Sequence, residues 1–288
     1  MPKILVTGSD GQLGSEIKDL SDEFGYDFLF TNRSKLDICD KEAIRSLIQK
    51  EKIDTIINCA AYTAVDKAQS QSEDAYNINH IGVKNLATLA KEYNLKLIHI
   101  STDYIFDGKN YKPYKIDEKP NPTSIYGKSK LAGEETIKEI EPKDTIIIRT
   151  SWVYSSFGNN FVKTMLNLGK TKKMLTVVYD QVGSPTYAKD LAKAILDIIP
   201  NIKNDKPKIY HYSNEGVLSW YDFAKEIMRM AKLECKIEPI STKEYPTPAS
   251  RPHYSLLDKS DIKRDFNLVI PYWKDSLDEC IKKMGERR

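Results

Sequence analysis

Short apolar runs alternate with longer amphipathic segments over the first half of the chain. Runs of β-branched and aromatic residues favour buried strands, whereas apolar residues spaced three and four apart favour helices. The pattern predicts strands at residues 4–6, 27–30, 55–58, 96–100 and 145–148, and helices at 12–22, 41–50, 72–93 and 123–140. Because helical segments follow strands in regular succession, we expect a doubly wound, Rossmann-like α/β fold with helices on both faces of a parallel sheet.

A glycine-rich segment follows the first predicted strand. It reads Thr7-Gly8-Ser9-Asp10-Gly11-Gln12-Leu13-Gly14, with G-x-x-G-x-x-G spacing in place of the better-known G-x-G-x-x-G of dinucleotide sites. Glycines at these positions permit a tight turn and a close approach of the backbone to phosphate. A helix that begins near Gln12 would direct its free N–H groups at a pyrophosphate. The segment predicts dinucleotide binding, and an ordinary glycine-rich turn is the alternative.

Small and polar residues also follow the third and fourth predicted strands. These segments read Asn58-Cys59-Ala60-Ala61 and Ser101-Thr102-Asp103-Tyr104. Open parallel sheets bind their ligands at the carboxyl ends of the strands. We therefore expect both segments and the glycine turn to border one cleft.

A tyrosine and a lysine lie one helical turn apart in the segment Tyr126-Gly127-Lys128-Ser129-Lys130. Residues four apart share a helix face, and a nearby ammonium should lower the phenol pKa from its usual value of about 10. Thr102 can add a hydrogen bond to a substrate oxygen. Combined with the glycine segment, the pair predicts carbonyl reduction by a nicotinamide cofactor with Tyr126 as proton donor. A surface pair that stabilises a helix is the alternative.

The composition is that of an ordinary globular protein and narrows the classes of partner. The chain has 288 residues, of which 44 are basic and 41 acidic, for a net charge of +3. This balance gives no reason to expect a nucleic-acid or membrane partner. The cysteines at 39, 59, 235 and 280 are scattered without a C-x-x-C pair. We therefore expect neither a zinc site nor a disulfide framework, and a cytoplasmic location.

The regular alternation weakens after about residue 150, where prolines separate shorter helical patterns such as residues 219–232. We therefore predict a dinucleotide-binding domain over residues 1–150. Residues 151–288 are predicted to form mainly a smaller, mixed α/β substrate-binding part that is interleaved with the first.

The motifs occur in an order that resembles the extended short-chain dehydrogenase/reductase superfamily, and longer segments narrow the resemblance to the dTDP-4-dehydrorhamnose reductase family. These segments are N-C-A-A-Y-T-A-V-D-K-A (58–68), S-T-D-Y-I-F-D-G (101–108), R-T-S-W-V-Y (149–154), N-N-F (159–161), D-Q-V-G-S-P-T (180–186) and P-T-P-A-S-R-P (246–252). The resemblance runs along nearly the whole chain. It implies reduction of the C4 ketone of dTDP-4-dehydro-L-rhamnose to dTDP-L-rhamnose.

The resemblance also implies roles for individual residues. The catalytic set would be Thr102, Tyr126 and Lys130. The cofactor would contact Gly8, Gly11, Gln12, Leu13, Gly14, Asp37, Ile38, Ala60, Ala61, Tyr62, Thr63, Tyr126 and Lys130. The nucleotide-sugar would contact Thr102, Asp103, Tyr104, Trp152, Asn160 and Arg251. Without the resemblance, a core position for Trp152 and an internal ion pair for Arg251 would be favoured.

The segment after the second predicted strand bears on the choice of cofactor. It reads Thr31-Asn32-Arg33-Ser34 and lacks the acid that binds the ribose hydroxyls in NAD-selective sites. Because a guanidinium suits a 2′-phosphate, Arg33 favours NADPH, with NADH as a further cofactor. Some members of the resembled family are dimers bridged by Mg²⁺ on glutamates. Glu16 matches one such position, but Lys189 stands where a second acid would be, so we expect no metal site and leave a homodimer open.

Four other functions are compared with the same pattern. A nucleotide-sugar dehydratase would need an Asp-Glu pair after Thr102, whereas this chain has Asp103-Tyr104. An epimerase would retain its cofactor through the cycle, and both this activity and the reduction of another nucleotide-sugar stay open. A regulatory subunit of the methionine adenosyltransferase type would bind the dinucleotide without turnover. Consumption of reduced cofactor with the dTDP-ketosugar distinguishes the reductase from the regulatory subunit.

Overall fold

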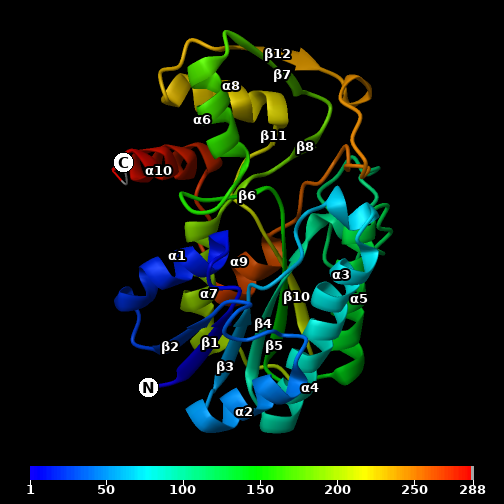
Figure 1. The fold of residues 1–288 in the computed structure, drawn as a ribbon, viewed down its shortest axis with the longest axis vertical. Helices are drawn as coiled ribbons and strands as arrows, with labels where there is room; N and C mark the ends of the chain where they lie inside the picture. Colours follow the sequence, from blue (N-terminus) through cyan, green and yellow to red (C-terminus); the bar gives the residue numbers. More distant parts are fainter. Residues whose placement is uncertain (287–288) are drawn as a thin grey trace.

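The computed structural model describes residues 1–286, and its centre is a six-stranded parallel sheet (Figure 1). The strands are β1 (Lys3–Thr7), β2 (Asp27–Thr31), β3 (Thr55–Asn58), β4 (Lys96–Thr102), β5 (Thr145–Thr150) and β10 (Lys208–Tyr212). Their order is β10-β5-β4-β3-β1-β2, and every neighbouring pair is parallel. The predicted doubly wound fold is confirmed, and its first five strands lie where the apolar runs predicted them.

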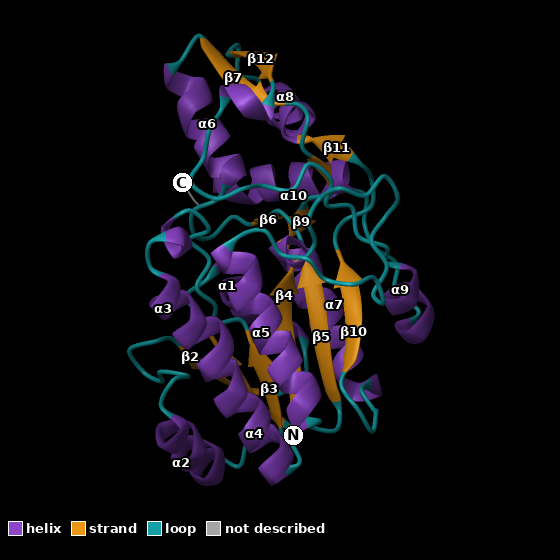
Figure 2. Cartoon of the chain, turned by 90° about the vertical axis from the view of Figure 1, so that its right-hand side faces the viewer, coloured by secondary structure: helices purple, strands orange, loops and turns teal. Residues whose placement is uncertain are grey.

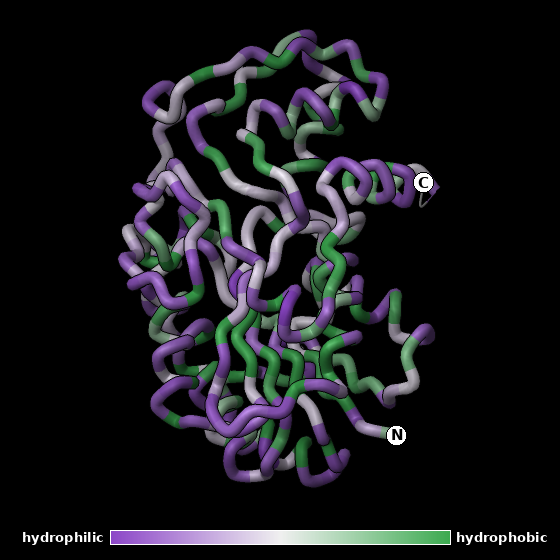
Figure 3. The backbone as a smooth tube through the Cα atoms, turned by 180° about the vertical axis from the view of Figure 1, so that it is seen from behind, coloured by the Kyte–Doolittle hydropathy of each residue, from purple (hydrophilic) through white to green (hydrophobic). Residues whose placement is uncertain are grey.

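Helices cover both faces of the sheet (Figure 2). Alternate residues of a strand point to opposite faces, so Ile4 and Val6 pack with one set of helices and Leu5 with the other. The first set is α1 (Gln12–Leu20) and α7 (Ala188–Ile198). The second set is α2 (Lys41–Glu51), α4 (Val83–Tyr93) and α5 (Ile125–Ile140). The apolar chain segments gather in the central strands, as the hydropathy colouring of Figure 3 shows.

The helix predicted over residues 72–93 contains an irregular stretch. It consists of α3 (Ser72–Tyr76), a π-helical segment (Asn77–Gly82) and α4. Within that segment Asn79 binds both backbone groups of Tyr62, accepting from its N–H at 2.9 Å and donating to its C=O at 3.1 Å. Asn79 also donates to Ser129 Oγ at 3.0 Å. The π-helical segment therefore joins the loop after β3 to helix α5.

Helix α5 begins at a capped end that lies against the end of β4. The Ser124 hydroxyl accepts a hydrogen bond from the N–H of Gly127 at 3.1 Å, which satisfies one of the free donors of the first turn. A Cβ atom at Gly127 would lie 2.2 Å from the carbonyl oxygen of Tyr104. Only glycine permits this close approach, and it brings the first turn of α5 next to the residues that follow β4.

A smaller group of elements lies beyond the carboxyl ends of the strands, in the upper part of Figure 1. Its elements are β6 (Val153–Tyr154), α6 (Phe161–Thr171), β7 (Met174–Val178), β8 (Val182–Gly183), β9 (Thr186–Tyr187), β11 (Leu218–Ser219), α8 (Trp220–Met230), β12 (Lys236–Ile240) and α10 (Trp273–Glu286). They share a core that contains Phe223, Ile227 and Leu277. The helix predicted at 219–232 is α8.

Two elements of the second half belong to the central layer instead. Helix α7 packs against α1, and β10 pairs with β5 at the edge of the sheet. The short helix α9 (Ser260–Phe266) packs beside β10. The sequence pattern did not identify β10, because Lys-Ile-Tyr-His-Tyr lacks the uninterrupted apolar run of the other strands.

Candidate functional site

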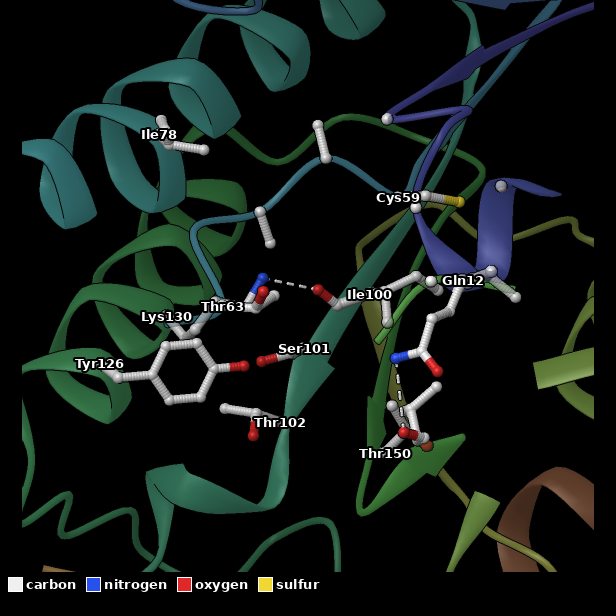
Figure 4. Close-up of a pocket in the computed structure, with 18 of the residues that line it drawn as sticks. Gln12, Cys59, Thr63, Ile78, Ile100, Ser101, Thr102, Tyr126, Lys130 and Thr150 are labelled. Carbon is white, nitrogen blue, oxygen red and sulfur yellow. Dashed lines mark hydrogen bonds between the residues drawn. The ribbon is translucent and has the colours of Figure 1, made fainter. Parts of the chain in front are cut away.

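A cleft of about 660 Å³ opens at the carboxyl ends of the strands, where the glycine turn, β4 and α5 meet (Figure 4). Most of the residues predicted for the site line this cleft: Gly8, Gly11, Gln12, Leu13, Gly14, Arg33, Asp37, Ile38, Ala60, Ala61, Thr63, Thr102, Asp103, Tyr104, Tyr126, Lys130 and Trp152. Tyr62, Asn160 and Arg251 are not among the lining residues. The three strand-end segments therefore border one cleft, as expected.

The turn between β1 and α1 has a shape that requires glycine. Gly8 has a φ of +64°, and a Cβ atom there would lie 2.6 Å from the backbone nitrogen of Ala60. A Cβ atom at Gly14 would lie 2.6 Å from the carbonyl oxygen of Gly8. Helix α1 begins directly after Gly11 and lines the cleft with its first residues. Free N–H groups at a helix N-terminus bind phosphate, so this cradle fits a pyrophosphate.

Gln12 joins the glycine turn to the upper part of the molecule. Its Nε2 donates to the carbonyl oxygen of Val153 at 3.4 Å, and its Oε1 accepts from Asn160 Nδ2 at 3.0 Å. Asn160 also caps α6, accepting from the N–H of Lys163 at 3.1 Å. Asn160 therefore fixes the orientation of Gln12 and does not itself line the cleft.

Arg33 lies at the end of the cleft that follows β2. Its side chain is 79% exposed, and its Nε lies 3.8 Å from Asp37 Oδ2. Ile38, next to Asp37, is buried under Gly82, where a Cβ atom would lie 2.6 Å from the isoleucine Cδ1. The end of the cleft thus combines an apolar wall with a guanidinium that is open to solvent, which suits an adenosine that carries a 2′-phosphate.

Thr102, Tyr126 and Lys130 are buried around the middle of the cleft (Figure 4). Tyr126 packs edge-on against Tyr104, with 5.5 Å between the ring centroids. Lys130 Nζ donates to the carbonyl oxygen of Ile100 at 2.6 Å and lies 3.4 Å from His99 Nε2. The predicted tyrosine and lysine therefore face the same space from one side of α5.

The expected lowering of the pKa of Tyr126 was wrong. Burial raises the pKa of Tyr126 to about 12, and the hydrogen bond with Thr102 offsets only part of this effect. Burial also lowers the pKa of Lys130 to about 8, although the nearby Glu134 carboxylate acts in the opposite direction. Desolvation thus dominates the pKa of Tyr126, and the phenol keeps its proton at neutral pH.

A buried ion pair lies directly behind these residues. Glu134, one turn beyond Lys130 on α5, binds Arg149 of β5, with Nη2 and Oε2 2.7 Å apart. Ser101 donates to the same carboxylate at 2.5 Å. No sequence motif marked this pair, although Glu134 follows Lys130 at the i,i+4 spacing of helix neighbours.

The other end of the cleft is aromatic and acidic. Trp152, which has a φ of +49°, stacks on Trp220 with 3.8 Å between ring centroids. Asp103 is buried, and its Oδ1 accepts from the Thr102 hydroxyl at 3.0 Å. Burial raises the pKa of Asp103 to about 7. Trp152 gives this end of the cleft a flat apolar surface against which a sugar or a base can pack.

Two residues predicted to contact ligands, neither of which lines the cleft, make internal contacts in the structure. Arg251 binds Asp66, with Nη2 and Oδ2 2.7 Å apart, which is the internal ion pair favoured without the family resemblance. The Tyr62 hydroxyl donates to Gln71 at 2.6 Å. Further lining residues had no ligand role assigned from the sequence: Leu36, Cys59, Val65, Ile78, Ile100, Ser101, Thr150, Val153, Gly158, Asn159 and Leu191. Cys59 and Ser101 belong to the segments expected to border the cleft, and Val65, Thr150, Val153 and Asn159 lie within the quoted motifs, which was the available signal.

Glu16, the residue that the family resemblance connects with a metal, is fully buried and ion-paired. Lys283 of α10 lies 2.7 Å from its Oε2, and Ser155 donates to its Oε1 at 2.5 Å. Lys189 binds Glu279. Within residues 1–286, no group of three or more His, Cys, Asp or Glu residues is arranged to hold a metal ion. Over the same residues, no helix has the length and apolar character needed to cross a bilayer.

Comparisons with known proteins agree on one family. The family model described as RmlD substrate binding domain matches residues 2–286. The spore coat polysaccharide biosynthesis protein SpsK of Bacillus subtilis is 42% identical over 98% of both chains. The dTDP-4-dehydrorhamnose reductase of Aggregatibacter actinomycetemcomitans is 42% identical over 96% of this chain and 97% of its own. The crystal structure of the Bacillus anthracis dTDP-4-dehydrorhamnose reductase in complex with NADP matches with a TM-score of 0.93, at 39% identity over 98% of this chain and all of that one.

Proposed function

The chain belongs to the RmlD substrate binding domain family, and on that premise we propose that it reduces the C4 ketone of dTDP-4-dehydro-L-rhamnose to dTDP-L-rhamnose. The observation that carries the proposal is the meeting of the phosphate-binding turn at Gly8 with Thr102, Tyr126 and Lys130 in one cleft. A cofactor bound along the turn would reach the phenol and the ammonium. This is the constellation that carbonyl reduction needs.

NADPH is the proposed cofactor, with NADH also usable. The cradle formed by Gly8, Gly11 and Gly14 would hold the pyrophosphate, and Arg33 would meet the 2′-phosphate. The further residues proposed to contact the cofactor are Gln12, Leu13, Asp37, Ile38, Ala60, Ala61, Tyr62, Thr63, Tyr126 and Lys130. The bound nicotinamide supplies the hydride that reduces the ketone.

The protein side chains supply the proton. Tyr126 has a pKa of about 12, so the phenol keeps its proton until an alkoxide develops on the substrate. Its hydroxyl then donates that proton to the C4 oxygen. The Thr102 hydroxyl, which donates to Asp103 Oδ1 in the free protein, turns to donate a second hydrogen bond to the same oxygen and so stabilises the developing charge. Lys130, held by the carbonyl oxygen of Ile100, places its positive charge beside the phenolate that remains.

Residues at the aromatic end of the cleft are proposed to bind the nucleotide-sugar. Trp152 offers an apolar face held in place by the stacked Trp220, and Asp103 and Tyr104 follow Thr102 at the end of β4. Asn160 is proposed to act indirectly, by orienting the Gln12 side chain through a hydrogen bond. Arg251 is proposed to act indirectly as well, by its ion pair with Asp66. We assign residues 1–150 mainly to dinucleotide binding and residues 151–288 mainly to substrate binding.

We also propose a cytoplasmic location, because Cys39, Cys59, Cys235 and Cys280 are all unpaired thiols. A regulatory, non-catalytic role is less favoured, since the cleft holds buried side chains suited to proton transfer. A dehydratase is less favoured as well, because Tyr104 occupies the position of its second acid.

The test is the consumption of NADPH and NADH with dTDP-4-dehydro-L-rhamnose made in a coupled reaction. Oxidation of the cofactor together with formation of dTDP-rhamnose supports the reductase, and the ratio of the two rates gives the cofactor preference. Protein that binds NADPH without oxidising it in the presence of the ketosugar would overturn the proposal.

A further inference from the structure

A row of buried polar side chains leads from β1 across the sheet to Lys130. Thr7, Asn58 and His99 lie on the adjacent strands β1, β3 and β4 in matched register, and each is at most 1% exposed. Thr7 Oγ1 donates to Asn58 Oδ1 at 2.7 Å. Asn58 Nδ2 lies 3.0 Å from His99 Nδ1, and His99 Nε2 lies 3.4 Å from Lys130 Nζ. The proposed function uses only the last member of this row.

One backbone group fixes the orientation of the whole row. The N–H of Ala60 can only donate, and it lies 3.2 Å from Asn58 Oδ1. The other end of the amide, which is the NH₂ group, therefore faces His99. Because that NH₂ group donates, His99 Nδ1 must be the acceptor. The opposite orientation of Asn58 would place its NH₂ group against the N–H of Ala60.

The single proton of the imidazole must then lie on Nε2. Burial and the neighbouring Lys130 charge hold the pKa of His99 well below its usual value, so the ring is neutral. A neutral imidazole carries one N–H, and its Nδ1 is an acceptor. His99 thus presents an N–H donor to Lys130 Nζ, whose other contact is the carbonyl oxygen of Ile100. A neutral amine satisfies both contacts, whereas an ammonium meets the N–H of His99 with another donor.

The buried His211 provides a comparison within the same molecule. Its Nδ1 lies 3.0 Å from the carbonyl oxygen of Tyr114, so Nδ1 must carry the proton. Its Nε2 lies 3.4 Å from Arg149 Nη1 and accepts from the guanidinium. The two buried histidines are therefore expected in opposite tautomers. Only His99 turns a donor toward a cation.

We propose that His99 is a positioning residue for the reductase function proposed above: as a neutral imidazole protonated on Nε2, it disfavours the ammonium form of Lys130 and so limits the pH range of turnover. Other ionisable groups surround the lysine. Glu134 on α5 favours its charged form, but that carboxylate is shared with Arg149 of β5. Asp103, Tyr104, Tyr126 and Cys59 are the other ionisable groups that line this part of the cleft.

The tautomer is tested directly on the wild-type protein, without any activity measurement. Long-range ¹H–¹⁵N spectra of protein labelled with ¹⁵N-histidine distinguish the two ring nitrogens, and His99→Phe identifies the His99 signals by their loss. Substitution of the other three histidines in turn assigns the same signals by elimination if His99→Phe does not fold. The expected result is Nε2–H for His99 and Nδ1–H for His211 from about pH 6 to 9. A His99 ring that carries Nδ1–H, or both protons, overturns the proposal.

The consequence for Lys130 is tested by the pH dependence of kcat/KM for NADPH oxidation. His99→Phe keeps a ring in the site and removes the N–H donor that faces Lys130. The alkaline limb of the profile, which is the pH above which kcat/KM falls, should therefore rise by about half to one pH unit. Ile98→Ala is the control, because Ile98 is the neighbouring residue of β4 and packs in the core on the other face of the sheet. This substitution should lower the stability of the fold and leave the alkaline limb in place. An unmoved limb in folded His99→Phe contradicts the proposal. Lack of turnover in the wild-type protein would refute the proposed function. It would not refute the tautomer assigned to His99, because the NMR measurement does not depend on turnover.

Discussion

Replacing Tyr126 with phenylalanine removes one buried hydroxyl and leaves the ring in place. The contact with Tyr104 depends on the ring, so the edge-on packing is retained. Thr102 donates to Asp103 Oδ1, and it keeps that partner when the phenol is lost. The substitution therefore removes about one net hydrogen bond, and we expect the free energy of unfolding to fall by about 1 kcal/mol or less.

The effect on turnover should be much larger. A general acid positioned at the reacting oxygen contributes about 10²–10⁴-fold, so kcat for NADPH oxidation should fall by a factor in that range. The affinity for NADPH should be largely retained, because the substitution removes only the hydroxyl and the ring that lines the cleft stays in place. The assays are initial rates with the dTDP-ketosugar, fluorescence titration with NADPH, and a denaturant melt to confirm the fold.

Tyr154→Phe is the matched control. Its hydroxyl is buried and has no hydrogen-bond partner within residues 1–286, and its side chain does not line the cleft. Its turnover should equal that of the wild type. Near wild-type turnover in Tyr126→Phe would refute the assignment of the proton donor. A loss of NADPH affinity that accounts for the whole loss of rate would refute it as well.

Three further changes probe neighbouring parts of the site. Lys130→Met should lower kcat about a hundredfold or more and weaken NADPH binding; retention of both rate and affinity would make the lysine structural. Arg33→Ala should reduce the preference for NADPH over NADH by about tenfold, measured as the ratio of kcat/KM, and an unchanged ratio would exclude its contact with the 2′-phosphate. Burial acts to raise the pKa of Glu134, but Arg149 holds this pKa below its usual value. The stabilisation by the ion pair is therefore complete above about pH 4.5 and is lost as the pH falls through the lowered pKa. Glu134→Gln should therefore lower the free energy of unfolding by about 3–5 kcal/mol at neutral pH, with a smaller difference in acid, and melts of equal stability would contradict this.

The central sheet could be predicted because its inner strands are buried on both faces. Ile4 to Val6 and Ile146 to Ile148 are continuous apolar runs, and such runs favour parallel strands in a doubly wound fold. Strand β10 escaped prediction because it lies at an edge and carries Tyr210 and His211, whose polar atoms find partners only in the folded protein. Its place beside β5 is set by tertiary packing, which a local pattern does not record.

The candidate site could be predicted where a motif requires one backbone shape or one helix face. Gly8 and the pair of Tyr126 and Lys130 are of this kind. The electrostatics could not be predicted, because the pKa of Tyr126 depends on how completely the fold removes it from water. An internal ion pair of Arg251 was one of the interpretations of the sequence, but its partner could not be predicted, since Asp66 lies far away in the sequence and only the fold brings the two together.

The most direct test of the proposed function follows the hydride itself. The protein is incubated with dTDP-4-dehydro-L-rhamnose and NADPH that carries deuterium at the transferable position of the nicotinamide. The account predicts dTDP-L-rhamnose with deuterium at C4, in an amount equal to the NADPH consumed. Unlabelled product, deuterium at another carbon, or no product from protein that binds NADPH would contradict it.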